Sequence, residues 1–210
     1  MAVQKGFLLV TMEPPPTRED EFNDWYDNEH IPERGSLPGF ESARRFVCIN
    51  GWPKYLAMYD LEEHGVLQRP EYLDTSWKKF GAWTRRAMAP VRGQYRGEGD
   101  QVYPGQAGTA PTMARLIVTR FSDLPDTDPA DVIEPLRASY EGRPEVIQLR
   151  IFRSNYNDKI DYLALVETRM PLLDIRPDID KIGDLANHLD LLNEYSPYWI
   201  RGHLPGVFSS

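Results

Sequence analysis

The chain has 210 residues, of which 41% are hydrophobic and 27% are charged, so it can bury a core and does not have the composition of a disordered protein. Its formal net charge of -8, without any run of Lys and Arg interleaved with aromatic residues, opposes binding to nucleic acid or to an anionic membrane surface. No run of about 18 apolar residues and no apolar leader occurs, so we expect a cytoplasmic protein.

The first predicted strand covers residues 6–12, an apolar run that is followed by three prolines. A helix is predicted next. Thr17 and Asp20 form a capping-box pattern at its start, and Pro32 predicts its end.

Two further strands are predicted over residues 40–49 and 54–61, joined by Asn50-Gly51, a dipeptide favoured in tight hairpins. A second helix is expected over residues 70–87, because apolar residues recur there at three- and four-residue steps. A short strand over residues 91–96 then completes a βαββαβ order.

Residues 97–111 are rich in Gly and Pro without periodicity, which is typical of a linker. The same order of elements then restarts. Its predicted elements are a strand over 113–121, a helix over 129–141, a hairpin over 145–154 and 160–168, a helix over 178–194 and a strand over 199–208. We therefore expect an N-terminal repeat over residues 1–96 and a C-terminal repeat over residues 112–210, each a four-stranded sheet with its helices on one face.

The run Trp25-Tyr-Asp-Asn-Glu-His-Ile-Pro32, followed by Pro38-Gly-Phe40 and Arg44-Arg-Phe46, resembles the signature of dimeric α/β-barrel proteins of the EthD-like group. The resemblance implies an α+β fold in which two ferredoxin-like βαββαβ repeats pair sheet-to-sheet within one chain, with a ligand cavity between sheet and helices. The second half resembles the fold only, because Leu136 faces His30 in the repeat alignment. The superfamily includes monooxygenases, cyclases, isomerases and haem-binding enzymes, so the resemblance does not select a reaction.

Phe22, Tyr26 and His30 follow one another at four-residue steps and so share a helix face, whose apolar start indicates that it points inward. His30 is therefore the predicted catalytic acid or base, with Tyr26 donating a hydrogen bond to an oxyanion of the substrate. The helix C-terminus favours a charged imidazole and burial favours a neutral one. The alternative is that both side chains are structural.

The candidates for substrate contact are aromatic, imidazole or guanidinium side chains: Trp25, Arg44, Arg45, Tyr59, His64 and Trp77. Arg44 and Arg45 occupy alternate faces of one strand, so only one of them can serve the cavity. Structural ion pairs, core packing and an exposed loop at His64 are the competing interpretations. No second His at ligand spacing accompanies His30, so no metal site is predicted.

The leading hypothesis is a cofactor-independent enzyme that acts on a small aromatic or polyketide-like compound by acid-base chemistry at His30. Isomerisation, cyclisation, hydration and lyase chemistry all remain open. The alternatives are a non-catalytic binding or carrier protein, and a haem-binding protein that uses His30 or His64 as axial ligand. Because the two halves can pair with each other, we expect a monomer or a weak homodimer.

Overall fold

The computed structural model describes residues 4–76, 79–125, 127–156 and 159–198. Within these ranges, eight strands close into one antiparallel barrel in the order β1-β3-β2-β8-β5-β7-β6-β4. The strands are β1 (Gly6–Glu13), β2 (Phe40–Asn50), β3 (Tyr55–Leu61), β4 (Arg92–Tyr103), β5 (Arg115–Phe121), β6 (Val146–Tyr156), β7 (Lys159–Thr168) and β8 (Leu189–Pro197). The predicted α+β barrel class is thereby confirmed.

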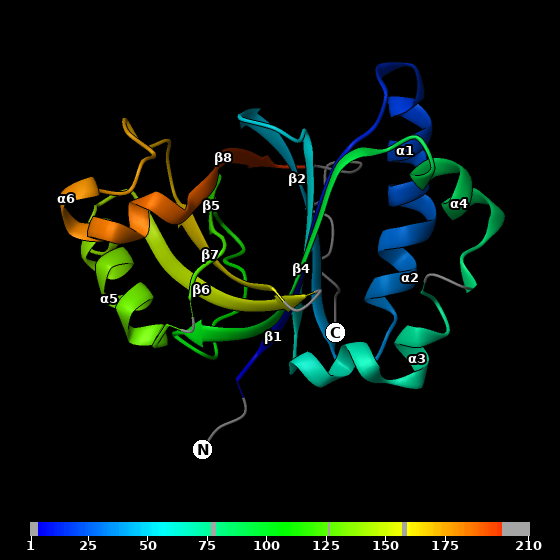
Figure 1. Ribbon diagram of the computed structural model, residues 1–210. Coiled ribbons are helices and arrows are strands. Elements are labelled where there is room, and N and C mark those ends of the chain that lie inside the picture. The colour runs from blue at the N-terminus through cyan, green and yellow to red at the C-terminus, as the bar shows by residue number, and fades with distance from the viewer. Residues whose placement is uncertain (1–3, 77–78, 126, 157–158, 199–210) are drawn as a thin grey trace.

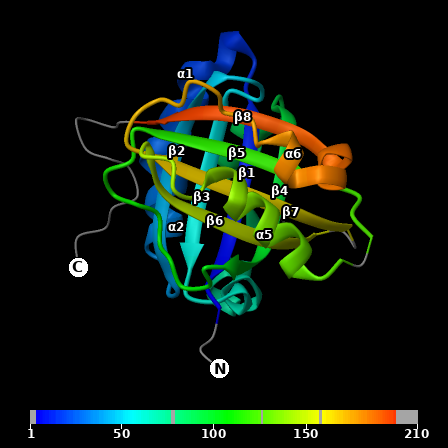
Figure 2. The ribbon, with the colours of Figure 1, turned by 90° about the vertical axis from the view of Figure 1, so that its left-hand side faces the viewer.

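Each half of the barrel uses the same strand order, β4-β1-β3-β2 in the first and β8-β5-β7-β6 in the second. Antiparallel pairing of β2 with β8 and of β4 with β6 joins the halves at both edges. The described helices lie outside the barrel, with α1 to α4 against one side and α5 and α6 against the other (Figures 1 and 2). The barrel wall thus separates the two helix layers.

Alternation along β1 shows how the sequence fills these layers. Phe7 and Leu9 point into the barrel, where they join Phe152 and Leu163 from the second half. Leu8 and Val10 face the other way and pack with the helices of the first half. An uninterrupted apolar run is therefore needed in β1, because both faces of the strand are buried.

The described helical elements are mostly short. They are η1 (Pro16–Arg18), α1 (Glu19–Trp25), η2 (Tyr26–His30), α2 (Ile31–Gly35), η3 (His64–Gln68), α3 (Pro70–Leu73), α4 (Ala82–Met88), α5 (Pro129–Tyr140), α6 (Ile179–Ile182) and η5 (Gly183–His188). Among the described residues, no helix combines the length and apolar character that crossing a membrane requires.

The first helix differs from its prediction at both ends. Thr17 lies inside η1 and does not cap α1, whose N-cap position is Arg18. The chain also stays helical past Pro32 to Gly35, through the π-helical turn η2, in which Ile31 N–H donates to the Tyr26 carbonyl. This wider turn makes room for Pro32, which lacks an N–H and would clash with the turn before it in a regular helix.

The helix predicted over residues 70–87 is interrupted, since α3 ends at Leu73 and α4 begins at Ala82. The hydroxyls of Thr75 and Ser76 donate to the carbonyls of Tyr72 and Leu73. Such local bonds compete with continuation of a helix, and the periodic spacing of apolar residues does not reveal them.

Part of the predicted linker is a strand. β4 continues to Tyr103, and its Gly99 pairs with both Phe7 of β1 and Ser154 of β6. At Gly99, with φ of 156°, an added Cβ would lie 2.1 Å from the Arg153 carbonyl oxygen. Glycine is therefore required by the close approach of β6, which joins the two halves, and does not mark a flexible connection here.

The helix predicted over residues 178–194 is also too long. Helical structure ends at His188, and β8 begins at Leu189 and pairs with β5 and β2. The spacing of the apolar residues from Leu189 onward is consistent with both a helix and a strand. The segment forms a strand because it pairs with neighbouring strands of the barrel. The strand predicted over 199–208 lies outside the described residues.

Candidate functional site

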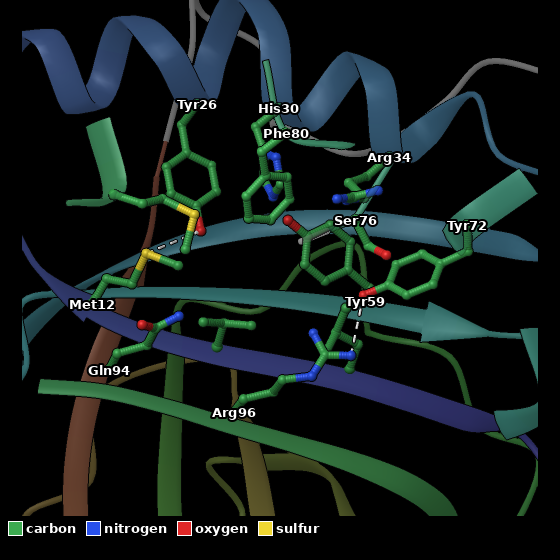
Figure 3. A pocket seen from close by; sticks show the side chains of 13 residues that line it. Met12, Tyr26, His30, Arg34, Tyr59, Tyr72, Ser76, Phe80, Gln94 and Arg96 are labelled. Atoms are coloured by element: carbon green, nitrogen blue, oxygen red, sulfur yellow. Dashed lines mark hydrogen bonds between the residues drawn. The ribbon is translucent and has the colours of Figure 1, made fainter. Parts of the chain in front are cut away.

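A small cavity lies between the first helix layer and the sheet of the N-terminal half. Its volume is about 40 Å³. It is lined by Leu8, Val10, Met12, Tyr26, His30, Arg34, Tyr59, Tyr72, Ser76, Phe80, Met88, Gln94 and Arg96. Figure 3 shows that Tyr26, His30 and Arg34 enter it from one continuous helical stretch, while Tyr59, Met12, Gln94 and Arg96 reach it from the strands below.

His30 is the imidazole at the centre of this helical stretch. Its ring centroid lies 4.6 Å from that of Trp25 and 5.2 Å from that of Tyr26, which it meets edge-on. The side chain is 9% exposed, and its Nδ1 is buried without a hydrogen-bond partner among the described residues. Burial is the main cause that holds the pKa of His30 well below its usual 6.5, and the positive charges of Arg34 and Arg45 add to it. Burial and these charges therefore favour the neutral imidazole, which keeps one ring nitrogen as an acceptor.

Two buried tyrosines face the same cavity as hydrogen-bond donors. Tyr26 Oη donates to Met12 Sδ at 3.7 Å, which is a weak acceptor. Tyr59 Oη is buried without a partner in the described part of the chain. Burial raises the pKa of Tyr26 to about 12 and that of Tyr59 well above 10, so both stay protonated.

Arg34 and Arg96 bring positive charge to the cavity. Arg34 Nη2 donates to the Thr75 carbonyl at 2.7 Å, Nη1 donates to Thr75 Oγ1, and the guanidinium lies 5.0 Å from the centre of the Tyr72 ring. Arg96 forms an ion pair with Glu98, and its Nη2 donates to Tyr72 Oη at 3.1 Å. Glu98 compensates the charge of Arg96, whereas Arg34 has no ion-pair partner within the described ranges.

Several predicted site residues do not line this cavity. Trp25 lies behind His30, with its Nε1 donating to Thr84 Oγ1 at 3.1 Å, so it supports the histidine from the protein side. His64 belongs to η3, outside the lining, and its backbone packs against Gly6. Trp77 lies outside the described residues.

The two consecutive arginines point to opposite faces of β2, as predicted. Arg45 reaches the helix layer, but it pairs there with Asp27 at 2.7 Å and donates to Asn23 at 2.7 Å. Arg44 points to the other face and donates to the Ala110 carbonyl at 2.9 Å. Arg45 therefore forms a structural ion pair. Neither arginine lines the cavity.

Among the residues that line the cavity, Arg34, Tyr72, Ser76 and Arg96 were not predicted from the sequence. Arg34 continues the four-residue steps of Tyr26 and His30, but it follows Pro32, where the helix was expected to end. His30 accordingly does not lie at a helix C-terminus. The four-residue spacing that links Tyr26, His30 and Arg34 was the sequence signal that could have identified Arg34.

In the packing that the structure describes, the residues around His30 provide neither a metal-binding cluster nor space for haem. Across the residues that the structure describes, no group of three or more His, Cys, Asp or Glu side chains could hold a metal ion. The imidazole of His30 packs against Trp25 and Tyr26 and faces a space of about 40 Å³. Pockets for drug-sized ligands and cofactors measure about 300–1,000 Å³, so haem would require a different packing around His30.

No family model matches the chain. Among curated proteins, it is similar to core atranone cluster protein 1 of Stachybotrys chlorohalonatus, with 34% identity over 80 residues. The match covers 36% of this chain and 34% of that protein, so the chain spans about a third of the length of this relative.

Solved structures match the chain over nearly its whole length. An anthrone oxidase-like protein superposes with a TM-score of 0.66 at 9% identity, covering 98% of this chain and 94% of that chain. A protein designated a chlorite dismutase gives 0.56 at 10% identity, covering 93% and 95%, and one designated a monooxygenase from Lactobacillus acidophilus gives 0.51 at 9%, covering 97% of each chain. The chain has the dimeric α+β barrel fold. Identities this low establish the fold alone.

Proposed function

We propose that this protein is a small-molecule enzyme in which neutral His30 removes a proton from a small aromatic or polyketide-like substrate. The observation that carries the proposal is that two buried polar atoms, His30 Nδ1 and Tyr59 Oη, lack hydrogen-bond partners among the described residues while their side chains line one cavity. An unsatisfied buried polar atom costs about 1–3 kcal/mol, and such atoms are uncommon in folded proteins. A bound substrate or water would satisfy both.

The chemistry follows from the protonation states. Neutral His30 can take a proton from carbon beside a carbonyl group, and the phenol of Tyr59 can donate to the oxygen on which negative charge develops. Return of the proton from His30 to another carbon completes an isomerisation. The carbanion can instead attack a second carbonyl group and close a ring, with the proton passing from His30 to the new alkoxide, or expel a neighbouring hydroxyl group, which leaves as water with the same proton. Positioned acid-base groups of this kind contribute about 10²–10⁴-fold in rate. No cofactor is needed for these steps.

Substrate size constrains how the site is used. The cavity of about 40 Å³ admits water or the reacting end of a ligand, but not an entire aromatic ring system. Phe80 and Met88 form part of its wall and are only half-buried. We propose that these two side chains move outward when substrate binds.

We further propose that the chain belongs to the EthD-like group and arose by tandem duplication. The motif at residues 25–32 supports the first, because it resembles the signature of that group, and part of it forms the π-helical turn beside the cavity. The shared strand order of the halves supports the second. Leu136 is fully buried in the apolar core of the second half, so the proposed chemistry belongs to the first half. Because the barrel closes within one chain, we also propose that the protein is a monomer or a weak homodimer.

The test is exchange of hydrogen for deuterium from solvent into 2-tetralone, an aromatic ketone with acidic hydrogens beside its carbonyl group. We expect His30→Asn to lower the enzyme-dependent exchange rate by about 10²-fold or more, with binding of the ketone largely retained. His188→Asn is the matched control, because His188 contacts the Ser122 carbonyl far from the cavity. Binding without exchange by the wild-type protein would instead favour a carrier, and equal exchange by His30→Asn would contradict the assignment.

A further inference from the structure

Arg34 is a buried cation that forms no ion pair among the described residues. Its side chain is 3% exposed, and it contacts the hydroxyl and carbonyl of Thr75 and the ring of Tyr72, all of which are uncharged. Glu33, the adjacent residue, is influenced by the charge of Arg34 but forms no ion pair with it in the described structure. Burying a guanidinium without an anion is costly, so this arrangement calls for an explanation.

The other buried arginines in the described chain have carboxylates that compensate their charge. Arg45 pairs with Asp27, and Arg150 pairs with Asp60 and Glu167. Arg44 forms no ion pair, but it lies in the field of those same two carboxylates. Arg34 differs from all three in that it lines the cavity beside His30 and Tyr59. Its missing anion is therefore expected in the cavity.

We infer that the ligand of this cavity carries an anionic oxygen and that Arg34 binds this oxygen. A carboxylate, an enolate and a phenolate share that chemistry. Thr75 occupies two of the five N–H donors of the guanidinium, which leaves donors for a ligand oxygen. Charge-assisted bonds from a guanidinium are about twice as strong as neutral ones, so the site should discriminate an anion from its neutral isostere.

This inference deepens the proposed function, on which it rests for its link to catalysis. An enolate formed when His30 removes a proton would be stabilised by the Arg34 charge. The preference for an anion is nevertheless a property of binding alone. It can hold where His30 proves not to be catalytic, and it can fail where His30 is catalytic.

The experiment compares binding of 2-naphthoate with binding of 2-naphthamide, its neutral isostere, by titration calorimetry at pH 7.5. We expect the wild-type protein to bind the carboxylate about 10-fold or more tightly than the amide, as a charge-assisted bond of about 1.5–3 kcal/mol gives. Arg34→Gln should abolish this preference, and Arg34→Lys should keep part of it. Arg86→Gln is the matched control, because Arg86 pairs with Glu21 on the surface.

The inference is overturned if the wild-type protein binds both probes equally or binds no naphthoate at millimolar concentration. It is also overturned if Arg34→Gln, shown by circular dichroism to be folded, keeps the full preference. The wild-type comparison does not depend on a variant, so it stands even where Arg34→Gln fails to fold.

Discussion

At the scale of single residues, the site contains two polar side chains, His30 and Tyr59, with atoms that lack hydrogen-bond partners among the described residues. Burial favours the neutral form of both, and Arg34, which forms no ion pair within the described ranges, lies in the same cavity. Each of these features lowers stability and favours a bound ligand. Mutations at these residues should therefore affect stability differently from mutations at ordinary core residues.

The buried neutral state of His30 predicts a pH dependence of stability. Its folded-state pKa is lowered by burial, so the unfolded chain takes up a proton near pH 6.5 that the folded chain does not. The contribution of neutral His30 to the free energy of unfolding is fully present above pH 6.5 and is lost as the pH falls toward the folded-state pKa. We expect His30→Gln to flatten the decrease in the free energy of unfolding between pH 7 and pH 5, measured by urea titration. An unchanged slope, equal to that of His188→Gln, would contradict this prediction.

Two arginines allow a direct comparison of stability. Arg34→Met removes an unpaired buried charge and should leave the free energy of unfolding unchanged or raise it. Arg45→Met leaves Asp27 without its partner and removes a guanidinium that lies 4.3 Å from the Tyr26 ring centre, so we expect a loss of about 3 kcal/mol. Chemical denaturation of both variants provides the measurement. Equal losses would show that Arg34 is a structural residue.

At the scale of elements, the π-helical turn η2 is what brings Tyr26, His30 and Arg34 to one cavity. In a regular helix, each four-residue step rotates a side chain by about 40°, so three residues at such steps would diverge around the axis. The wider turn offsets this rotation. The four-residue pattern in the sequence predicted the inward face correctly for Tyr26 and His30, but it could not reveal the π turn.

The connection between α3 and α4 supplies the wall that we propose to be displaceable. Phe80→Ala should enlarge the cavity and tighten binding of 2-naphthoate by several-fold, because the ring no longer has to move. Leu73→Ala, a substitution at an exposed residue outside the lining, should leave affinity unchanged. Calorimetric titration of both variants is the test. Weaker binding by Phe80→Ala would mean that Phe80 contacts the ligand in place.

Sequence patterns located most strands but misassigned segments in which tertiary pairing overrides local preference. Leu189 to Pro197 was expected to be partly helical and instead forms β8 between β2 and β5. Gly97 and Gly99 suggested a linker, although the close contact of β4 with β6 requires Gly99. The predicted helix 70–87 failed because hydroxyl bonds at Thr75 and Ser76 are local chemistry that periodicity does not report.

At the scale of the whole molecule, a buried polar network ties the two halves of the barrel together. Arg150 is fully buried and donates to Asp60 of β3 at 2.6 Å and to Glu167 of β7 at 2.8 Å. It also donates to Thr109 Oγ1 at 2.8 Å, in the connection between the halves. None of these partners lines the cavity, so the network stabilises the barrel without taking part in the proposed chemistry.

This network predicts a second pH window. Burial opposes ionisation of Asp60, but the Arg150 charge and hydrogen bonds from Thr109 and Ser42 lower its pKa to about 2. The contribution of ionised Asp60 to the free energy of unfolding is therefore present above its pKa of 3.8 in the unfolded chain, and it is lost as the pH falls toward 2. Arg150→Met should lower the free energy of unfolding by about 3–5 kcal/mol at neutral pH. It should also remove the contribution of Asp60 to the loss of stability in acid. Chemical denaturation at a series of pH values measures both effects. An acid transition that keeps its slope in Arg150→Met would contradict this role.

The pH profile of deuterium exchange into 2-tetralone tests the central claim most directly, since the ketone itself does not ionise between pH 5 and pH 8. A neutral His30 with a lowered pKa predicts a rate that stays constant from pH 8 to below pH 6.5 and that His30→Asn abolishes. A rate that falls by half near pH 6.5, or one that survives in His30→Asn, would contradict the assignment of His30 as a buried neutral base.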